Sequence, residues 1–148
     1  MGSSPHSFFM ERTLILLKPD AVQKGICGKV ITRFEDAGLR IRGCKMIHLD
    51  PKVLREHYAH IAEKPFYPEV EEFMGSSPVI AMVIEGDNVI GKIREMLGAT
   101  DSRKAEEGTI RREHGVDMMV NVAHASDSAE TAKAEIRRFF SDAELFSY

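Results

Sequence analysis

At 148 residues the chain has the length of one domain, and a domain of this size buries about 70% of the surface of its unfolded chain without covalent cross-links. Hydrophobic residues make up 43% and charged residues 29%, as in ordinary globular proteins. The formal net charge of −3 excludes an overall electrostatic bias toward nucleic acid or anionic membranes, so any anion-binding surface must be local.

The first part of the chain predicts a strand, a helix and a second strand. Residues 12–18 form a short β-type run that Pro19 stops. Residues 28–38 have apolar side chains at helical spacing and reach Gly38, a common helix stop. Residues 39–49 alternate apolar and polar over much of their length, which indicates a half-buried strand.

The middle of the chain predicts two helices and the clearest buried strand. Residues 51–63 predict a helix, with Asp50 as its N-cap and Pro51 at its first position. A short helix over 68–74 precedes the apolar run 78–86, which has the length and composition of a buried strand.

The last part predicts a helix over 88–98 capped by Asp87, a short strand over 120–125 and a final helix over 128–140. Ser126 or Asp127 can cap that final helix. The resulting element order indicates an α+β fold with helices packed on one sheet. We expect residues 1–9 to be a tag or a disordered extension and residues 10–148 to form a single domain.

The cysteines and apolar runs suggest a cytoplasmic protein. Cys27 and Cys44 lack CxxC spacing, which disfavours a disulfide framework and a zinc site and favours a reducing compartment. The longest apolar runs, 14–17 and 79–84, fall far short of the ~20 residues that span a bilayer. We therefore expect no membrane partner.

The stretch "QKGICGKVIT" does not fit a P-loop. A P-loop requires GxxxxGK[ST], whereas Gly25 and Gly28 are too close together and Val30 follows the lysine. Glycines of a turn and a helix start explain this stretch better.

The histidines form no HExxH zinc motif. His57 and His60 lie one helical turn apart, and we expect both at the surface or an interface. His124 is open to two interpretations, a core imidazole or a nucleophile. Nearby hydrogen-bonding residues, among them Ser126 and Glu135, can fix one tautomer and leave the other ring nitrogen free to attack.

Several motifs resemble those of nucleoside diphosphate kinases, in the same order and spacing. "NVAHASDS" is similar to the active-site histidine signature of the family, and "ERTLILLKPDAVQKGICG" resembles its opening strand and KPD turn. The stretches "EHY", "KPFY", "SSPVIAMVIEG", "REMLGATD" and "GTIR" follow in family order. The resemblance extends from Glu11 to Tyr148.

The resemblance implies a ferredoxin-like βαββαβ antiparallel sheet with helices packed on it, and an enzyme that transfers the terminal phosphate of a nucleoside triphosphate to a nucleoside diphosphate. The implied ping-pong mechanism passes through phospho-His124. The catalytic positions that match the family are His124, Lys18, Glu135, Ser126 and Tyr58. The matching nucleotide-binding positions are Lys18, Phe66, Val70, Arg94, Thr100, Arg111 and Asn121.

The implied roles suit phosphoryl transfer, in which the protein mainly aligns the groups and stabilises charge. Lys18, Arg94 and Arg111 would hold phosphates, Phe66 would stack on the base beside Val70, and Asn121 would contact the sugar. Thr100 would grip the terminal phosphates together with Arg94, and Tyr58 would flank the catalytic pocket. Ser126 and Glu135 would orient His124. Mg²⁺ bridged by the nucleotide phosphates is the implied cofactor, with no direct protein ligand assigned.

The resemblance also implies a homotetramer or homohexamer that acts on nucleoside tri- and diphosphates without obligatory nucleic acid. The alternative function is a non-catalytic ferredoxin-like module that binds nucleotide or nucleic acid. The chain departs from the family pattern at several positions. His60 replaces an acidic residue, so the histidine network is expected to lack one carboxylate, and Glu107 replaces a proline in a loop tied to subunit contacts. The other departures are Lys64, Arg112, Glu113 and His114.

Overall fold

The computed structural model describes residues 10–148 and contains a four-stranded antiparallel sheet with the strand order β2-β3-β1-β4. The tag or extension expected over residues 1–9 lies outside the described residues. The strands are β1 (Met10–Leu17), β2 (Arg40–Ile47), β3 (Val79–Asp87) and β4 (Ala123–Ala125). None of the helices over residues 10–148 is long and apolar enough to cross a membrane.

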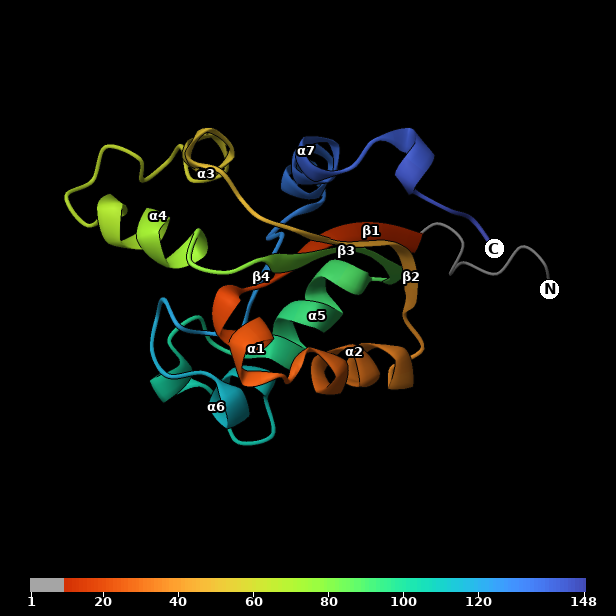
Figure 1. Ribbon diagram of the computed structural model, residues 1–148. Coiled ribbons are helices and arrows are strands. Elements are labelled where there is room, and N and C mark those ends of the chain that lie inside the picture. The colour runs from red at the N-terminus through yellow and green to blue at the C-terminus, as the bar shows by residue number, and fades with distance from the viewer. Residues whose placement is uncertain (1–9) are drawn as a thin grey trace.

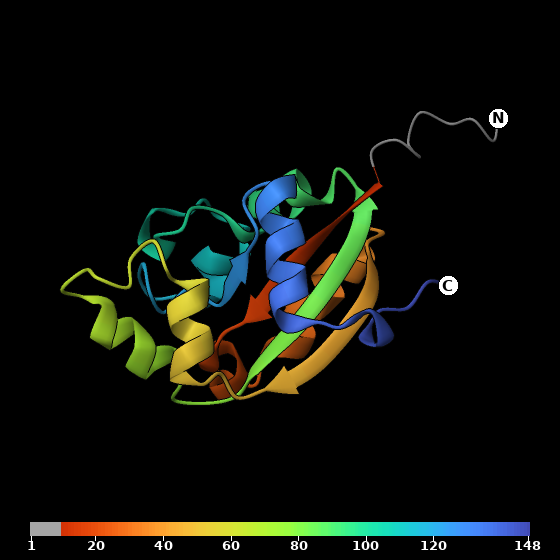
Figure 2. The same cartoon turned by 90° about the horizontal axis from the view of Figure 1, so that it is seen from above.

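Helices cover both faces of the sheet (Figures 1 and 2). On one face lie α3 (Pro51–His57) and α7 (Ala129–Phe139), and on the other lie α2 (Cys27–Asp36) and α5 (Val89–Leu97). The sheet and this pattern of elements agree with the ferredoxin-like α+β fold that the sequence predicts, with α4 (Tyr67–Met74) beside α3 at one end. Both faces of the central strands are therefore buried, which explains their nearly continuous apolar sequences.

Alternate side chains of β1 enter two separate cores. Leu14 and Leu16 pack with residues of α3, α4 and α7, whereas Ile15 and Leu17 pack with those of α2 and α5. All four side chains are fully buried. This alternation follows from the two-residue period of a strand. Because a shift by one residue would exchange the two faces, the alternation also fixes the register in which the C-terminal end of β1 pairs with β4.

Two short helices and two caps differ from the sequence expectations. The structure adds α1 (Pro19–Lys24) and α6 (Ile110–His114), which had no recognisable apolar period. Asp87 does not cap α5, because it is the last residue of β3, and Asn88 occupies the cap in the left-handed region. Ser128, rather than Ser126 or Asp127, caps α7 by accepting a hydrogen bond from the Thr131 amide at 3.1 Å.

Two expected elements are shorter in the structure. The helix expected over 51–63 ends at His57, because turn hydrogen bonds such as Ile61 N to Tyr58 O, at 2.9 Å, replace the helical pattern. The strand expected over 120–125 spans only Ala123–Ala125, because Val122 has a φ of 76°. Both differences place side chains at the edge of the same cavity.

Candidate functional site

A cavity of about 710 Å³ opens between α3, β4, α7 and the segment around α6. Its lining brings together eight of the residues that the sequence predicted for the site. They are Lys18, Tyr58, Arg94, Thr100, Arg111, Asn121, His124 and Glu135. A second hollow of about 590 Å³ shares Lys18 and Tyr58 with the first and adds Phe66 and Val70.

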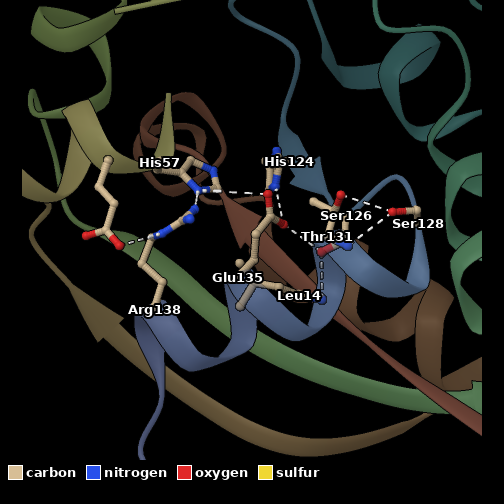
Figure 3. Close-up of polar contacts among 9 residues, drawn as sticks. Leu14, His57, His124, Ser126, Ser128, Thr131, Glu135 and Arg138 are labelled. Carbon is tan, nitrogen blue, oxygen red and sulfur yellow. Dashed lines mark hydrogen bonds and ion pairs between the residues drawn. The ribbon is translucent and has the colours of Figure 1, made fainter. Parts of the chain in front are cut away.

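His124 stands in the middle of β4, where it pairs with Leu16 of β1. Its Nε2 lies 2.9 Å from Oε1 of Glu135 on α7 (Figure 3). The hydroxyl of the fully buried Ser126 donates to the same carboxylate oxygen at 2.6 Å. Because the carboxylate engages Nε2 as its hydrogen-bond donor, Nδ1 is left with the lone pair of a neutral imidazole.

Glu135 can hold the histidine because its carboxyl group is ionised at neutral pH. Burial acts to raise the pKa of Glu135, but the hydrogen bonds from His124 and Ser126 outweigh burial and lower that pKa. The charged acceptor therefore strengthens the bond to the imidazole N–H. Glu135 supplies the carboxylate that holds His124, and His60 brings an imidazole to the cavity lining at the position where the resemblance implied an acidic residue.

The backbone before His124 adopts a conformation that a β-branched residue rarely takes. Val122 has a φ of 76°, and its amide donates to Oδ2 of the buried Asp20 at 3.0 Å. Its carbonyl accepts a hydrogen bond from the amide of Lys18 at 2.8 Å. Through these two hydrogen bonds the KPD turn fixes the segment that leads into β4. The fixed segment determines where Asn121 and His124 lie.

Lys18 is held at the cavity wall by two short hydrogen bonds. Its Nζ donates to the Met119 carbonyl and to Oδ1 of Asn121, each at 2.7 Å. Burial lowers the pKa of Lys18 to about 8, with Asp20 acting in the opposite direction. The side-chain amide of Asn121 in turn donates to the Thr100 carbonyl at 2.9 Å. Lys18, Asn121 and Thr100 are therefore connected by hydrogen bonds along one wall of the cavity.

The two predicted phosphate arginines differ in how they are held. Arg111 is buried and donates to the carbonyls of Gly98, Asn121 and Ala123 at 2.9, 3.2 and 2.7 Å. Burial, followed by the nearby Arg94, lowers the pKa of Arg111 to about 10. Arg94 is exposed and lines the cavity from α5. Arg111 is thus a fixed cation and Arg94 an adaptable one.

The second hollow has an apolar part suited to a flat ring, and the charged residues Lys18, Glu69, Arg103 and Asp117 complete its lining. Phe66 is 51% exposed at the start of α4, and Val70 lies one turn later on the same helix. Met118 is 61% exposed and lines both hollows. No sequence motif singled out Met118, because its place depends on the loop that follows α6 (Ile110–His114).

The structure contradicts the expectation that His57 lies at the surface. Its side chain is 1% exposed and its ring centroid lies 4.6 Å from that of His124. His60 is exposed, as expected, and lines the rim of the cavity. The sequence signal that could have found His57 was the apolar spacing of α3, which turns this position toward the sheet together with Leu54.

The departures after "GTI" have structural roles away from the cavity. Arg112 donates to the Ala105 carbonyl at 3.0 Å, Glu113 pairs with Arg33 at 3.1 Å, and the His114 carbonyl accepts from Lys24 at 2.7 Å. Arg112 therefore stabilises the loop that precedes α6.

His57, His124 and Glu135 bring potential metal-ligand atoms within 4.8 Å of one another. They do not fit Mg²⁺, which prefers oxygen ligands, because two of the three are imidazoles. Nδ1 of His57 and Nε2 of His124 are also already engaged in hydrogen bonds. The exposed carboxylates of Asp127 and Glu130 on the cavity lining are the oxygen donors that suit such an ion.

Comparisons with known proteins agree on one family. The family model described as "Nucleoside diphosphate kinase" matches residues 11–145. A nucleoside diphosphate kinase of Parabacteroides distasonis is 47% identical, and the match covers 94% of this chain and 91% of the relative. The solved structure of the Aquifex aeolicus nucleoside diphosphate kinase has 44% identity and a TM-score of 0.88, covering 93% of this chain and 99% of that chain. A Halobacterium salinarum nucleoside diphosphate kinase in complex with CDP has 41% identity and a TM-score of 0.90, covering 93% and 92%.

Proposed function

The chain belongs to the nucleoside diphosphate kinase family, and from this premise we propose that its phosphotransfer passes through His124. The enzyme transfers the terminal phosphate of a nucleoside triphosphate to a nucleoside diphosphate. The observation that carries the proposal is the 2.9 Å contact of His124 Nε2 with Glu135, beside a cavity lined by Lys18, Arg94 and Arg111.

In the first half-reaction, Nδ1 of His124 attacks the terminal phosphorus, the new N–P bond forms, and the bond to the leaving nucleoside diphosphate oxygen breaks. The imidazole gains positive charge as its lone pair forms that bond. Glu135 stabilises the charge because its carboxylate faces the Nε2–H. In the second half-reaction, an oxygen of the acceptor diphosphate takes the same phosphoryl group, and neutral His124 is regenerated.

Three cations balance the charge of the phosphates during both transfers. Arg111 is fixed by backbone carbonyls, so it needs little reorganisation when nucleotide enters. Arg94 is exposed and can adjust to the bound phosphates. Lys18 is tied to Asn121, which links the phosphate side of the cavity to the residue proposed to contact the sugar.

We propose Mg²⁺ as the divalent ion that this family of phosphotransferases requires. Mg²⁺ is commonly bound through substrate phosphates and one or two carboxylates. Asp127 and Glu130 would hold it together with the phosphate oxygens, and the bound ion would neutralise phosphate charge.

Base recognition is proposed to depend on stacking between Phe66 and the apolar Val70 and Met118. Every base offers a π-face, so stacking alone does not discriminate among bases. Broad use of purine and pyrimidine nucleotides follows. The non-catalytic binding module is not favoured, because the matched family is catalytic and the histidine network is intact.

We further propose that residues 10–148 act as one domain that assembles into a homotetramer or homohexamer in the cytoplasm, without obligatory nucleic acid or a membrane partner. The free Cys27 and Cys44 support a reducing compartment. Light scattering tests the assembly, and a monomer would contradict it.

Incubation with γ-labelled ATP and Mg²⁺ tests the proposed route. We expect label that is acid-labile and alkali-stable on the wild type and on His48→Ala, a control at an exposed histidine. His124→Ala should carry none. Equal labelling of His124→Ala, or an unlabelled wild type, would reject phosphohistidine at this position.

A further inference from the structure

His57 forms part of the wall behind the nucleophile, although phosphoryl transfer itself does not use it. Its ring meets the His124 ring edge-on, with centroids 4.6 Å apart and planes at 79° (Figure 3). Tyr58 and Phe139 contact it at centroid distances of 4.9 and 5.3 Å. A buried ring that packs in this way has its orientation fixed, which leaves only its tautomer to be set by hydrogen bonds.

Arg138 sets that tautomer. Its Nη1 lies 2.9 Å from Nδ1 of His57, while its Nε donates to Glu56 at 3.3 Å. A guanidinium can only donate, so Nδ1 must be the acceptor and the ring proton must be on Nε2. Among the residues that the structure describes, the buried Nε2 has no hydrogen-bond partner.

The tautomer matters because Glu135 lies between the two histidines. Oε1 of Glu135 accepts from His124 and Ser126, and Oε2 lies 3.9 Å from Nδ1 of His57. That distance is too long for a hydrogen bond. If His57 carried its proton on Nδ1, a small shift of the ring would bring Nδ1 within hydrogen-bond distance of Oε2. The carboxylate would then accept hydrogen bonds from two imidazoles.

We propose that Arg138 is a positioning residue that keeps the proton of His57 off Nδ1. Glu135 then accepts a hydrogen bond from the nucleophile His124 and none from His57. This role rests on the proposed phosphohistidine function. Without Arg138, His57 moves its proton to Nδ1, donates to Glu135 and draws the carboxylate away from His124.

The surrounding charges support a neutral His57. The titratable and charged groups that face it are His124 from β4, Glu135 and Arg138 from α7, and His60 beyond the end of α3. Burial first, and then His124, lower the pKa of His57 to about 3, with Glu135 alone acting to raise it. Whether His57 competes with His124 for a hydrogen bond to Glu135 therefore depends on which nitrogen of its neutral ring carries the proton.

The test combines a double-variant comparison with a kinetic readout at pH 8. Arg138→Leu should lower kcat about tenfold, the scale of one weakened hydrogen bond to a charged group, and should leave KM unchanged. Arg138→Lys restores a donor and should recover much of the loss. Arg137→Leu, on the exposed side of the same helix, is the matched control and should equal the wild type.

Adding His57→Phe to Arg138→Leu should raise kcat again, because the ring that competes for Glu135 is gone. A purely structural role for Arg138 predicts the opposite, since a second core change would lower activity further. Wild-type kcat in Arg138→Leu, or a double variant no faster than Arg138→Leu, would overturn the proposal.

Nitrogen NMR of the histidine rings in the nucleotide-free wild type tests the tautomer without any variant or turnover. We expect an unprotonated Nδ1 and a protonated Nε2 at His57. A proton on Nδ1 would refute the role of Arg138 even if His124 is phosphorylated. The expected tautomer would stand even if His124 were not the nucleophile, so the two failures are distinguishable.

Discussion

Replacing Glu135 with glutamine removes the charge that faces the nucleophile but keeps an oxygen of similar shape. The carboxylate accepts from His124 at 2.9 Å and from Ser126 at 2.6 Å, and the amide oxygen of glutamine can take both contacts. Hydrogen bonds to charged groups contribute about 1.5–3 kcal/mol, against about 0.5–1.5 kcal/mol for neutral pairs. The difference of about 1.5 kcal/mol corresponds to roughly tenfold slower phosphorylation of His124.

Rapid-quench measurement of phosphohistidine formation from ATP and Mg²⁺ gives this rate directly. Glu35→Gln is the control, because it removes an exposed carboxylate from α2 that does not line the cavity and does not touch the bond to His124. We expect the control to phosphorylate at the wild-type rate. A Glu135→Gln enzyme as fast as the wild type would show that the carboxylate does not stabilise the charged imidazole.

Three further predictions concern the base, a helix cap and the response to pH. Phe66→Ala should raise KM about tenfold for ADP, GDP and CDP alike, since stacking contributes about 1–3 kcal/mol per base, and loss for one base alone would contradict stacking. Ser128→Ala should lower the free energy of unfolding in urea by about 1 kcal/mol through loss of the α7 cap, and unchanged stability would argue against that cap. The pKa of His57 in the folded protein, about 3, lies below the ordinary histidine value of 6.5, so His57 takes up a proton on unfolding when the pH lies between these values. The free energy of unfolding should therefore fall as pH drops through that window, by up to about 1.4 kcal/mol per pH unit, and His57→Phe should flatten this slope in urea titrations at pH 7, 6 and 5.

The layers of the fold were predictable because apolar periodicity is a local property of the chain. Residues 78–86 and 88–98 carry strand and helix patterns over their whole length, and both elements form close to those limits. The cap of α7 was not predictable in the same way. Ser126, Asp127 and Ser128 are all good capping residues, and Ser126 is taken by Glu135, a contact that requires the folded α7.

The residues of the cavity were predictable from motifs, whereas the wall behind them was not. The structure brings His124, Lys18 and Arg111 to one cavity as the family resemblance implied. Their chemical roles remain predictions. His57 and Arg138 belong to no recognised motif as a pair, and they meet only because α3 and α7 cover the same face of the sheet. Tertiary packing, which spacing along the chain does not record, decides such contacts.

The central claim is that Glu135 holds one nitrogen of His124 and leaves the other to accept the phosphoryl group. Phosphorus and nitrogen NMR of the enzyme after reaction with ATP and Mg²⁺ tests it most directly. The account predicts phosphorus bonded to Nδ1 of His124, with Nε2 still protonated toward Glu135. Phosphorus on Nε2, or on another residue, would contradict it.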